Sequence, residues 1–332
     1  MRISFSACKQ AQPLVSFPGG FNMDPFDLNH RRRKEKVVVV MGATGTGKSR
    51  LSIDLATRFP AEIVNCDKMQ VYKGLNIATN KVTEEECRGV PHHLLGIVDP
   101  DDDFTATDFR RDASATVAAI VRRDRLPIIA GGSNSYIKAL VNDNVEFRSK
   151  YDCCFLWVDV ALPVLYSFVS ERVDRMVAAG LVEEVRRIFD PEADYTCGIR
   201  RAIGVPEMDT YFRAESNRNL DEKAKAELLR EAIDLIKGNT CNLARCQLQN
   251  ILRLQSQLGW DMHRIDATEV FERRGSGGSA ANEGWERLVA GPSARIVGRF
   301  LYEDDPFVTT ISAATASIMG ASPAAAVAAA TR

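Results

Sequence analysis

The stretch Val37–Ser49 (VVVVMGATGTGKS) constrains the fold of this chain more than any other feature. Four consecutive valines predict a strand that is buried on both faces, as in a parallel sheet covered by helices. The strand leads into a sequence that fits G-x-x-x-x-G-K-[ST] without a mismatch, which indicates a phosphate-binding loop followed by a helix. The residues expected to bind a phosphate or diphosphate are Gly42, Ala43, Thr44, Gly45, Thr46, Gly47, Lys48 and Ser49.

Each part of this loop has an expected chemical role. The glycines let backbone N–H groups converge on one anion, and Lys48 adds a mobile positive charge. Ser49 opens the next helix with a hydroxyl suited to a Mg²⁺ ligand, so Mg²⁺ is the expected cofactor. The motif alone does not distinguish ATP, GTP and other phosphate esters. The plainer interpretation is a glycine-rich turn that binds nothing.

Bulk composition excludes several classes of protein. The 332 residues carry 43 Lys and Arg against 44 Asp and Glu, so no overall field attracts nucleic acid or a membrane surface. The eight cysteines form no C-x-x-C pair, which is typical of reduced thiols in an intracellular protein. No apolar run is long enough to span a bilayer, and we expect a soluble chain.

The first 36 residues differ from the rest. No acidic residue precedes Asp24, and the basic cluster Arg31–Lys34 leads directly into the first predicted strand. An acid-poor, basic leader of this kind is typical of an organelle transit peptide. The alternative is an unstructured cytosolic arm. We expect residues 1–36 to contribute nothing to the fold.

Two further predicted strands end in residues of interest. Residues 61–67 form a short apolar strand that ends on Asp67, at the edge where open α/β sheets bind their ligands. Asp67 could cap the next helix, bind Mg²⁺ or act in catalysis, and it should face the phosphate loop. Residues 126–130 form another strand, which ends in Gly131-Gly132-Ser133 rather than in the acidic residue of an ordinary P-loop ATPase.

Two weaker candidates have structural explanations. The pair His92-His93 lacks a third metal ligand at a convincing spacing, so we expect hydrogen bonds in a packed loop rather than a zinc site. Asp159 ends a core strand at residues 153–160, and we expect a structural role for it.

These patterns predict an α/β fold, a P-loop NTPase-like parallel sheet flanked by helices, with a small helical subdomain. The core would comprise residues 37–164 and 236–271, and the helical subdomain residues 165–235. The chain from 272 to 332 is rich in Gly, Ser and Ala, and we expect it to be mostly disordered apart from one helix over 291–301.

The order and spacing of the motifs resemble the isopentenyltransferase family, and in detail its plant adenylate isopentenyltransferases, which open cytokinin synthesis. The resemblance extends from Val37 to about Phe271. Besides the phosphate loop, it rests on residues 67–75 (DKMQVYKGL), 131–136 (GGSNSY), 198–207 (GIRRAIGVPE) and 239–247 (NTCNLARCQ).

The resemblance implies transfer of the dimethylallyl group from dimethylallyl diphosphate to N6 of the adenine of ATP or ADP, with AMP as a further candidate. The loop, Lys48 and a Mg²⁺ held partly by Ser49 would stabilise the leaving diphosphate. Ser133 would hydrogen-bond the same group, and Arg245 would add charge to it. Asp67 would be the general base. Arg200 or Arg201 would contact the phosphates of the acceptor.

The family also implies a plastid location, with the cytoplasm as the alternative, and we expect a monomer that needs no membrane or tRNA. Two positions depart from the family pattern. Cys66 replaces a small hydroxyl residue, and Arg245-Cys246 replaces two adjacent basic residues of the bacterial tRNA-modifying members.

Two other functions compete with this one. A tRNA dimethylallyltransferase would need a large basic surface, which the net charge of -1 does not favour. A P-loop small-molecule kinase would explain residues 42–49 but not the Asp67/Gln70 pair and the Gly-Gly-Ser turn at their spacings.

Overall fold

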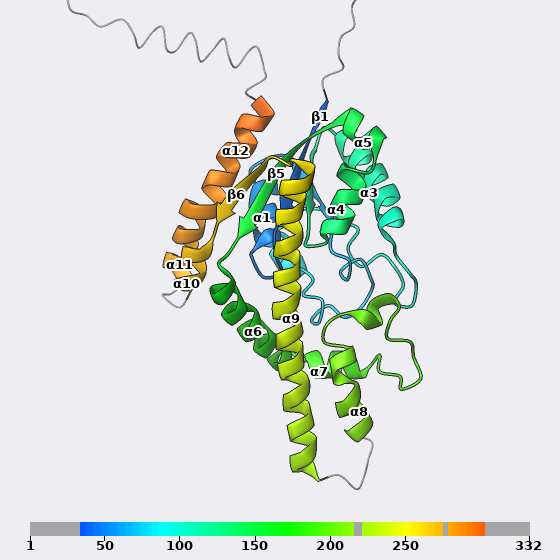
Figure 1. The fold of residues 1–332 in the computed structure, drawn as a ribbon. Coiled ribbons are helices and arrows are strands. Elements are labelled where there is room, and N and C mark those ends of the chain that lie inside the picture. The colour runs from blue at the N-terminus through cyan, green and yellow to red at the C-terminus, as the bar shows by residue number, and fades with distance from the viewer. Residues whose placement is uncertain (1–33, 216–220, 275–277, 303–332) are drawn as a thin grey trace, which may run out of the picture. The chain divides into compact units, whose positions relative to one another are not determined.

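A parallel sheet of six strands organises the protein (Figure 1). The computed structural model describes residues 34–215, 221–274 and 278–302. The strand order is β3-β2-β4-β1-β5-β6, and every neighbouring pair is parallel. The bounds are Glu35–Met41 for β1, Ala61–Asn65 for β2, His92–His93 for β3, Leu126–Ala130 for β4, Tyr151–Asp159 for β5 and Met262–Asp266 for β6. The predicted α/β fold with a P-loop-like parallel sheet is confirmed.

Strand β1 shows why the valine run needs helices on both faces. Val37 and Val39 belong to one buried cluster and Val38 and Val40 to the other, and none of the four side chains is exposed. Successive side chains of a strand point to opposite faces, so both faces of this central strand must be covered.

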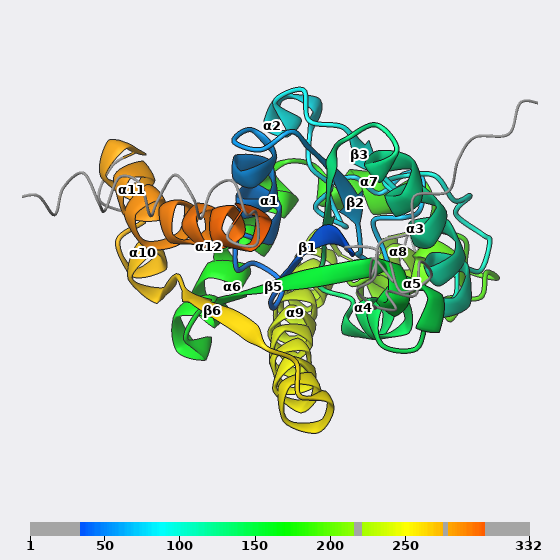
Figure 2. The ribbon, with the colours of Figure 1, turned by 90° about the horizontal axis from the view of Figure 1, so that it is seen from above.

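Helices cover the two faces of the sheet (Figure 2). The first face carries helix α1, which follows the phosphate loop, and the C-terminal helices; the second carries α3, α4 and the long helix α9. The bounds are Lys48–Ala56 for α1, Glu84–Cys87 for α2, Ala106–Val121 for α3, Asn134–Val141 for α4, Val145–Lys150 for α5, Leu162–Ala178 for α6 and Glu222–Leu258 for α9.

The predicted helical subdomain contains short helices beside the N-terminal half of α9, at the lower end of Figure 1. They are α7 (Leu181–Arg186), the 3₁₀ turns Gly198–Arg201 and Pro206–Met208, and α8 (Asp209–Glu215). Helix α9 runs without a break from Glu222 to Leu258, through Gly238. The predicted boundary between residues 235 and 236 therefore lies inside a helix that belongs to both regions.

The prediction that residues 272–332 are mostly disordered is wrong for part of this stretch. After α10 (Thr268–Glu272), α11 (Gly278–Trp285), a π-helical turn (Glu286–Ala290) and α12 (Gly291–Tyr302) pack against the first face of the sheet. The predicted helix over 291–301 is confirmed. The segment has few bulky apolar residues, but Trp285, Val289 and Val297 all lie in the core. Residues 303–332 and residues 1–33 of the predicted transit peptide lie outside the described residues. The prediction that residues 1–36 contribute nothing to the fold is wrong for Glu35 and Lys36, which begin β1 and pair with β5.

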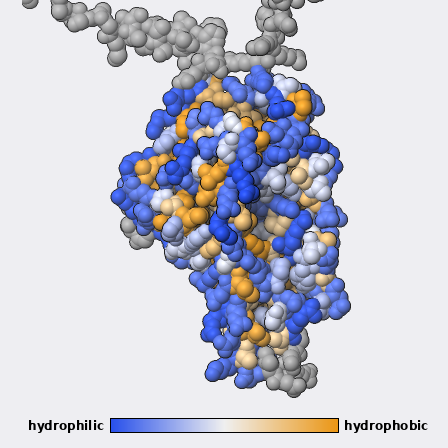
Figure 3. Space-filling model, in the orientation of Figure 1, coloured by the Kyte–Doolittle hydropathy of each residue, from blue (hydrophilic) through white to orange (hydrophobic). Residues whose placement is uncertain are grey.

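The face seen in Figure 3 is mostly hydrophilic, with hydrophobic residues scattered among the charged ones. None of the helices in the described ranges is both long and apolar enough to cross a bilayer.

Candidate active site

The phosphate loop joins β1 to α1 as the sequence predicts. The Ala43 carbonyl accepts hydrogen bonds from the Thr46 hydroxyl (2.9 Å) and from the Lys48 ammonium group (2.6 Å). Lys48 therefore folds back across its own loop and keeps two further N–H groups for a ligand. Helix α1 begins at Lys48, so its first unpaired N–H groups and its positive end face the same space.

Two cations share this loop. The Arg172 guanidinium, from α6, donates to the Thr44 hydroxyl (3.0 Å). Burial lowers the pKa of Lys48 to about 8, while the Asp67 carboxylate raises it and Arg172 lowers it. Burial also lowers the pKa of Arg172 to about 10, with Arg175 lowering it further and Asp67 raising it. Neighbouring positive charges of this kind are stabilised when a diphosphate binds between them.

Asp67 follows β2 and lies close enough to the loop to act on both cations, in agreement with the expectation that it faces the loop. Its Oδ1 accepts hydrogen bonds from the backbone N–H groups of Met69 (2.9 Å) and Gln70 (3.3 Å). The sequence allowed Asp67 to cap the next helix, but residues 68–71 form a turn and no helix begins there. Oδ1 of Asp67 caps this turn instead, and the cap uses one oxygen only. Within the described ranges no group donates to Oδ2, which leaves this oxygen for a ligand.

The Gly-Gly-Ser turn after β4 lies against the end of β2. A Cβ on Gly131 would be 2.0 Å from the Cys66 carbonyl oxygen, so only glycine permits this approach. The Ser133 hydroxyl accepts a hydrogen bond from the Lys68 backbone N–H (2.8 Å), and its own proton can still be donated. The side chain of buried Cys66 has a weak contact with this turn, from Sγ to the Ser133 carbonyl oxygen (3.8 Å).

Gln70 holds a loop rather than a ligand. Its side-chain NH₂ donates to the carbonyls of Thr79 and Asn80 (both 3.0 Å). Glu184 of α7 accepts from the backbone N–H groups of Ile77 and Ala78 in the same loop (3.0 and 2.9 Å). Hydrogen bonds from Gln70 and to Glu184 therefore hold the backbone of residues 77–80 in place.

Gln247 of α9 connects the two halves of the site. Its Oε1 accepts from the Thr44 backbone N–H (2.7 Å), and its Nε2 donates to the Gly132 carbonyl (3.0 Å). The phosphate loop and the Gly-Gly-Ser turn are thus fixed to each other through one side chain. As a consequence, the N–H of Thr44 is already used by the protein.

Three predicted arginine positions lie differently from one another. Arg245 is exposed on α9, with a long contact (3.5 Å) to Asn242, and the structure does not bring it to the loop. Arg200 is paired with Asp101. Arg201 donates to the Tyr72 hydroxyl (3.1 Å), and its charge adds to burial in lowering the pKa of Lys68, next to Asp67. Arg201 is therefore the arginine beside the candidate site.

The two weaker sequence candidates have the structural roles expected of them. A ring nitrogen of His93 lies 2.7 Å from a carboxylate oxygen of Glu62, and a ring nitrogen of His92 lies 2.8 Å from the Val90 carbonyl. Asp159 forms an ion pair with Arg264 (2.7 Å).

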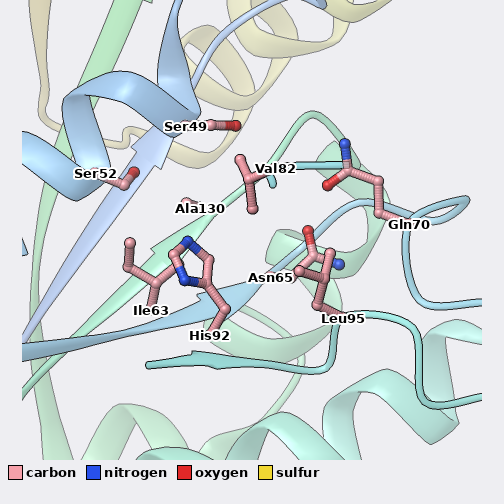
Figure 4. A pocket seen from close by; sticks show the side chains of 9 residues that line it. All are labelled: Ser49, Ser52, Ile63, Asn65, Gln70, Val82, His92, Leu95 and Ala130. Atoms are coloured by element: carbon pink, nitrogen blue, oxygen red, sulfur yellow. The ribbon is translucent and has the colours of Figure 1, made fainter. Parts of the chain in front are cut away.

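A pocket beside the start of α1 is lined by both polar and apolar side chains (Figure 4). The side chains of Ser49, Asn65 and Gln70 line it. Among the described residues no group of three His, Cys, Asp or Glu side chains could hold a metal by itself. Mg²⁺ commonly takes one or two protein oxygens and completes its shell with phosphate oxygens and water. The Ser49 hydroxyl fits a Mg²⁺ that arrives with a diphosphate.

Comparison with known proteins gives one matching family model and several similar relatives. The family model described as IPP transferase matches residues 70–150 and 142–253. The chain is 63% identical to adenylate isopentenyltransferase 5, chloroplastic, of Arabidopsis thaliana, over 92% of each chain. It is 54% identical to adenylate isopentenyltransferase 7, mitochondrial, of the same plant, over 90% of each chain. A eukaryotic dimethylallyltransferase acting on tRNA has a similar fold, with a TM-score of 0.68, 22% identity, and coverage of 81% of this chain and 80% of that one.

Proposed function

The chain belongs to the IPP transferase family and, within it, to the adenylate isopentenyltransferases, and on that premise we propose its reaction. It transfers the dimethylallyl group of dimethylallyl diphosphate to N6 of the adenine of ATP or ADP, with AMP as a third acceptor to be compared. This reaction is the first step of cytokinin synthesis. One observation supports the proposal most: the Asp67 carboxylate is close enough to act on two cations with lowered pKa values, Lys48 of the phosphate loop and Arg172, which contacts the loop from α6.

The charges of the loop indicate how dimethylallyl diphosphate, the donor, would be activated. An allylic C1–O bond breaks readily when the electron pair that leaves with the diphosphate is stabilised. We assign this role to the loop N–H groups, to Lys48 and to Arg172, with the Ser133 hydroxyl proton as a further donor. Mg²⁺, held in part by Ser49, would neutralise additional charge on the diphosphate.

Asp67 indicates how the adenine nucleotide, the acceptor of the dimethylallyl group, would react. The N6 amine of adenine attacks C1 of the dimethylallyl group, the N6–C1 bond forms as the C1–O bond breaks, and diphosphate leaves. N6 must then lose a proton, and we assign its acceptance to Oδ2 of Asp67, because Oδ1 already accepts from backbone N–H groups. Arg201 and Lys68, next to Asp67, are the cations best placed to meet the phosphates of the nucleotide.

A tRNA acceptor is the main alternative. The fold is shared with an enzyme that acts on tRNA. The overall charge of -1 argues against the large basic surface that a tRNA needs. A kinase of the P-loop type is a second alternative. This hypothesis does not explain why the Asp67 carboxylate lies near the loop.

The direct test is an acceptor comparison. The purified chain is incubated with Mg²⁺, labelled dimethylallyl diphosphate and one of ATP, ADP, AMP or an unmodified tRNA. We expect label to appear on N6 of ATP and ADP and inorganic diphosphate to be released in equal amount. Label on tRNA alone would replace the proposal with the main alternative. Phosphate transfer from ATP without prenylation would indicate a kinase.

The lowered pKa of Lys48 predicts a pH dependence. Only the protonated ammonium attracts the diphosphate, and in the free enzyme its pKa is about 8. Since kcat/KM reports the free enzyme, kcat/KM for dimethylallyl diphosphate should fall as the pH rises through about 8. Bound diphosphate stabilises the charged form, so kcat should fall only at higher pH.

Lys81 provides the control for this pH profile, because burial lowers its pKa to about 8 as well. A Lys81→Gln variant should keep the fall in kcat/KM at the same pH. If the fall disappears in that variant, Lys81 and not Lys48 controls the profile.

We further propose that the protein acts in a plastid. One similar relative is named chloroplastic and another mitochondrial, and residues 1–36 have the composition of a transit peptide. A fluorescent protein fused after residue 36 should accumulate in plastids in plant cells. Mitochondrial or cytosolic fluorescence would contradict the plastid proposal.

A further inference from the structure

The C-terminal segment 278–302 lies directly against the helix that follows the phosphate loop (Figure 2). Trp285, Val289, Ala290 and Val297 are buried in the same cluster as Leu51 and Leu55 of α1. This segment lies outside the residues matched by the family model, which end at 253. It nevertheless forms part of the wall behind the loop.

Trp285 is held in one orientation by three charged residues. Its indole N–H donates to Oδ2 of Asp54, on α1, at 2.7 Å. Asp54 also pairs with Arg88 (2.9 Å), so its carboxylate is fixed in turn. The guanidinium of Arg50 lies over the indole ring, 4.5 Å from the ring centre. A buried aromatic ring with a satisfied N–H and a cation on its face is a rigid platform.

The other side of this platform contacts the loop itself. Gly47 has φ +92°, and a Cβ there would be 2.6 Å from Cη2 and 2.9 Å from Cζ3 of Trp285. The indole therefore lies directly against the backbone of Gly47, the residue before Lys48. Gly47 is the N-cap of α1, so its position sets the direction of the first free N–H groups of the helix and of the Lys48 side chain.

We propose that Trp285 is a positioning residue for the phosphate loop. The indole, fixed by Asp54 and Arg50, supports the turn at Gly47 and so sets the places of Lys48 and the N–H groups that bind the diphosphate. Trp285 itself touches no substrate. The proposal rests on the proposed function only for the identity of the donor, because the contact between Trp285 and the loop exists whichever phosphate ester binds.

The test compares Trp285→Phe with Val297→Ala in the full chain. Both variants weaken the packing of the C-terminal segment, but only the first changes the contact with Gly47, since the atoms nearest to a Cβ on Gly47 all belong to Trp285. Displacement of groups that bind a reacting ligand by about 1 Å can reduce rates about 100-fold. For Trp285→Phe we expect kcat/KM for dimethylallyl diphosphate to fall by about 10- to 100-fold, with the KM for the nucleotide little changed. Val297→Ala should lower Tm and leave both kinetic constants unchanged.

A binding measurement separates this proposal from the proposed function. Inorganic diphosphate, titrated calorimetrically in the presence of Mg²⁺, should bind at least several-fold more weakly to Trp285→Phe than to the unchanged protein or to Val297→Ala. If the unchanged protein binds diphosphate but does not prenylate adenine nucleotides, the proposed function fails while a weakened Trp285→Phe still supports the positioning role. Equal diphosphate affinity in all three proteins would show that Trp285 only anchors the segment.

A second variant covers the case in which Trp285→Phe does not fold. Asp54→Ala removes the acceptor of the indole N–H and leaves the ring in place. It should weaken diphosphate binding in the same direction and by a smaller factor. Unchanged affinity in Asp54→Ala, together with a failure of Trp285→Phe to fold, would overturn the proposal.

Discussion

Asp67→Asn should lower kcat by about 10²- to 10⁴-fold, the range that a general base contributes, and leave the KM for dimethylallyl diphosphate nearly unchanged. The amide cannot accept the N6 proton, whereas its carbonyl oxygen can still accept the hydrogen bonds that Met69 and Gln70 donate to Oδ1. The substitution thus removes the base and keeps the turn. Steady-state rates at saturating nucleotide and donor give the measurement.

Asparagine is a sharper choice than alanine at this position. Asp67→Ala would also remove the cap of the turn, a loss that typically costs about 1 kcal/mol, so its effect on turnover would mix two causes. Asp159→Asn is the matched control, because Asp159 is the last residue of strand β5 but pairs with Arg264. It should retain near-normal kcat. Near-normal kcat in Asp67→Asn itself would remove Asp67 as the base.

The sequence was sufficient to predict those parts of the site whose residues are close together in the chain. Residues 37–49 place a strand, a loop and a helix in order, and the loop geometry follows from its own glycines. Asp67 could be placed because the carboxyl ends of all strands in a parallel sheet lie at the same edge, and this holds although β4 lies between β1 and β2. Strand order and helix packing were not needed for either inference.

The residues that the sequence did not reveal reach the loop from distant helices. Arg172 meets Thr44 across 128 residues of sequence, and Gln247 meets the same residue across 203. Arg172 lies on a helix with an ordinary apolar pattern and carries no signal of its own. Gln247 ends the motif 239–247, but the motif alone does not show that its side chain contacts the loop. Arg245 was chosen from a motif, yet its neighbour Gln247 is the side chain of α9 that contacts the loop. Only the rotation of α9 about its axis decides between them.

The prediction that the C-terminal segment is mostly disordered was wrong for a different reason. Its composition is that of a linker, and a few apolar residues cannot indicate a core unless the surface that receives them is known. Trp285 becomes meaningful only once Gly47 and Asp54 are seen to lie beneath and beside it.

Lys48→Met should lower kcat/KM for dimethylallyl diphosphate by about 10²- to 10³-fold, as expected for the loss of one group that stabilises developing negative charge. Methionine is of similar length and keeps the packing of the lysine stem, so the change removes chiefly the charge. Lys73→Met is the matched control. Lys73 is largely exposed and pairs with Asp99 (2.6 Å). The kinetic constants of the Lys73→Met variant should therefore equal those of the unchanged protein.

The Tm of the Lys48→Met variant shows whether a loss of activity is due to the missing charge or to unfolding. Lys48 forms no ion pair within the described ranges, and burial and Arg172 disfavour its charged form, which is why its pKa is lowered. A Lys whose pKa is lower in the folded than in the unfolded state destabilises the fold at pH 7, so its replacement by Met should leave Tm equal or higher. We therefore expect a protein that is at least as stable, barely active, and weak in binding inorganic diphosphate. If Lys48→Met keeps kcat/KM for the donor within about threefold, a change of less than 1 kcal/mol, the loop does not hold the diphosphate through this lysine.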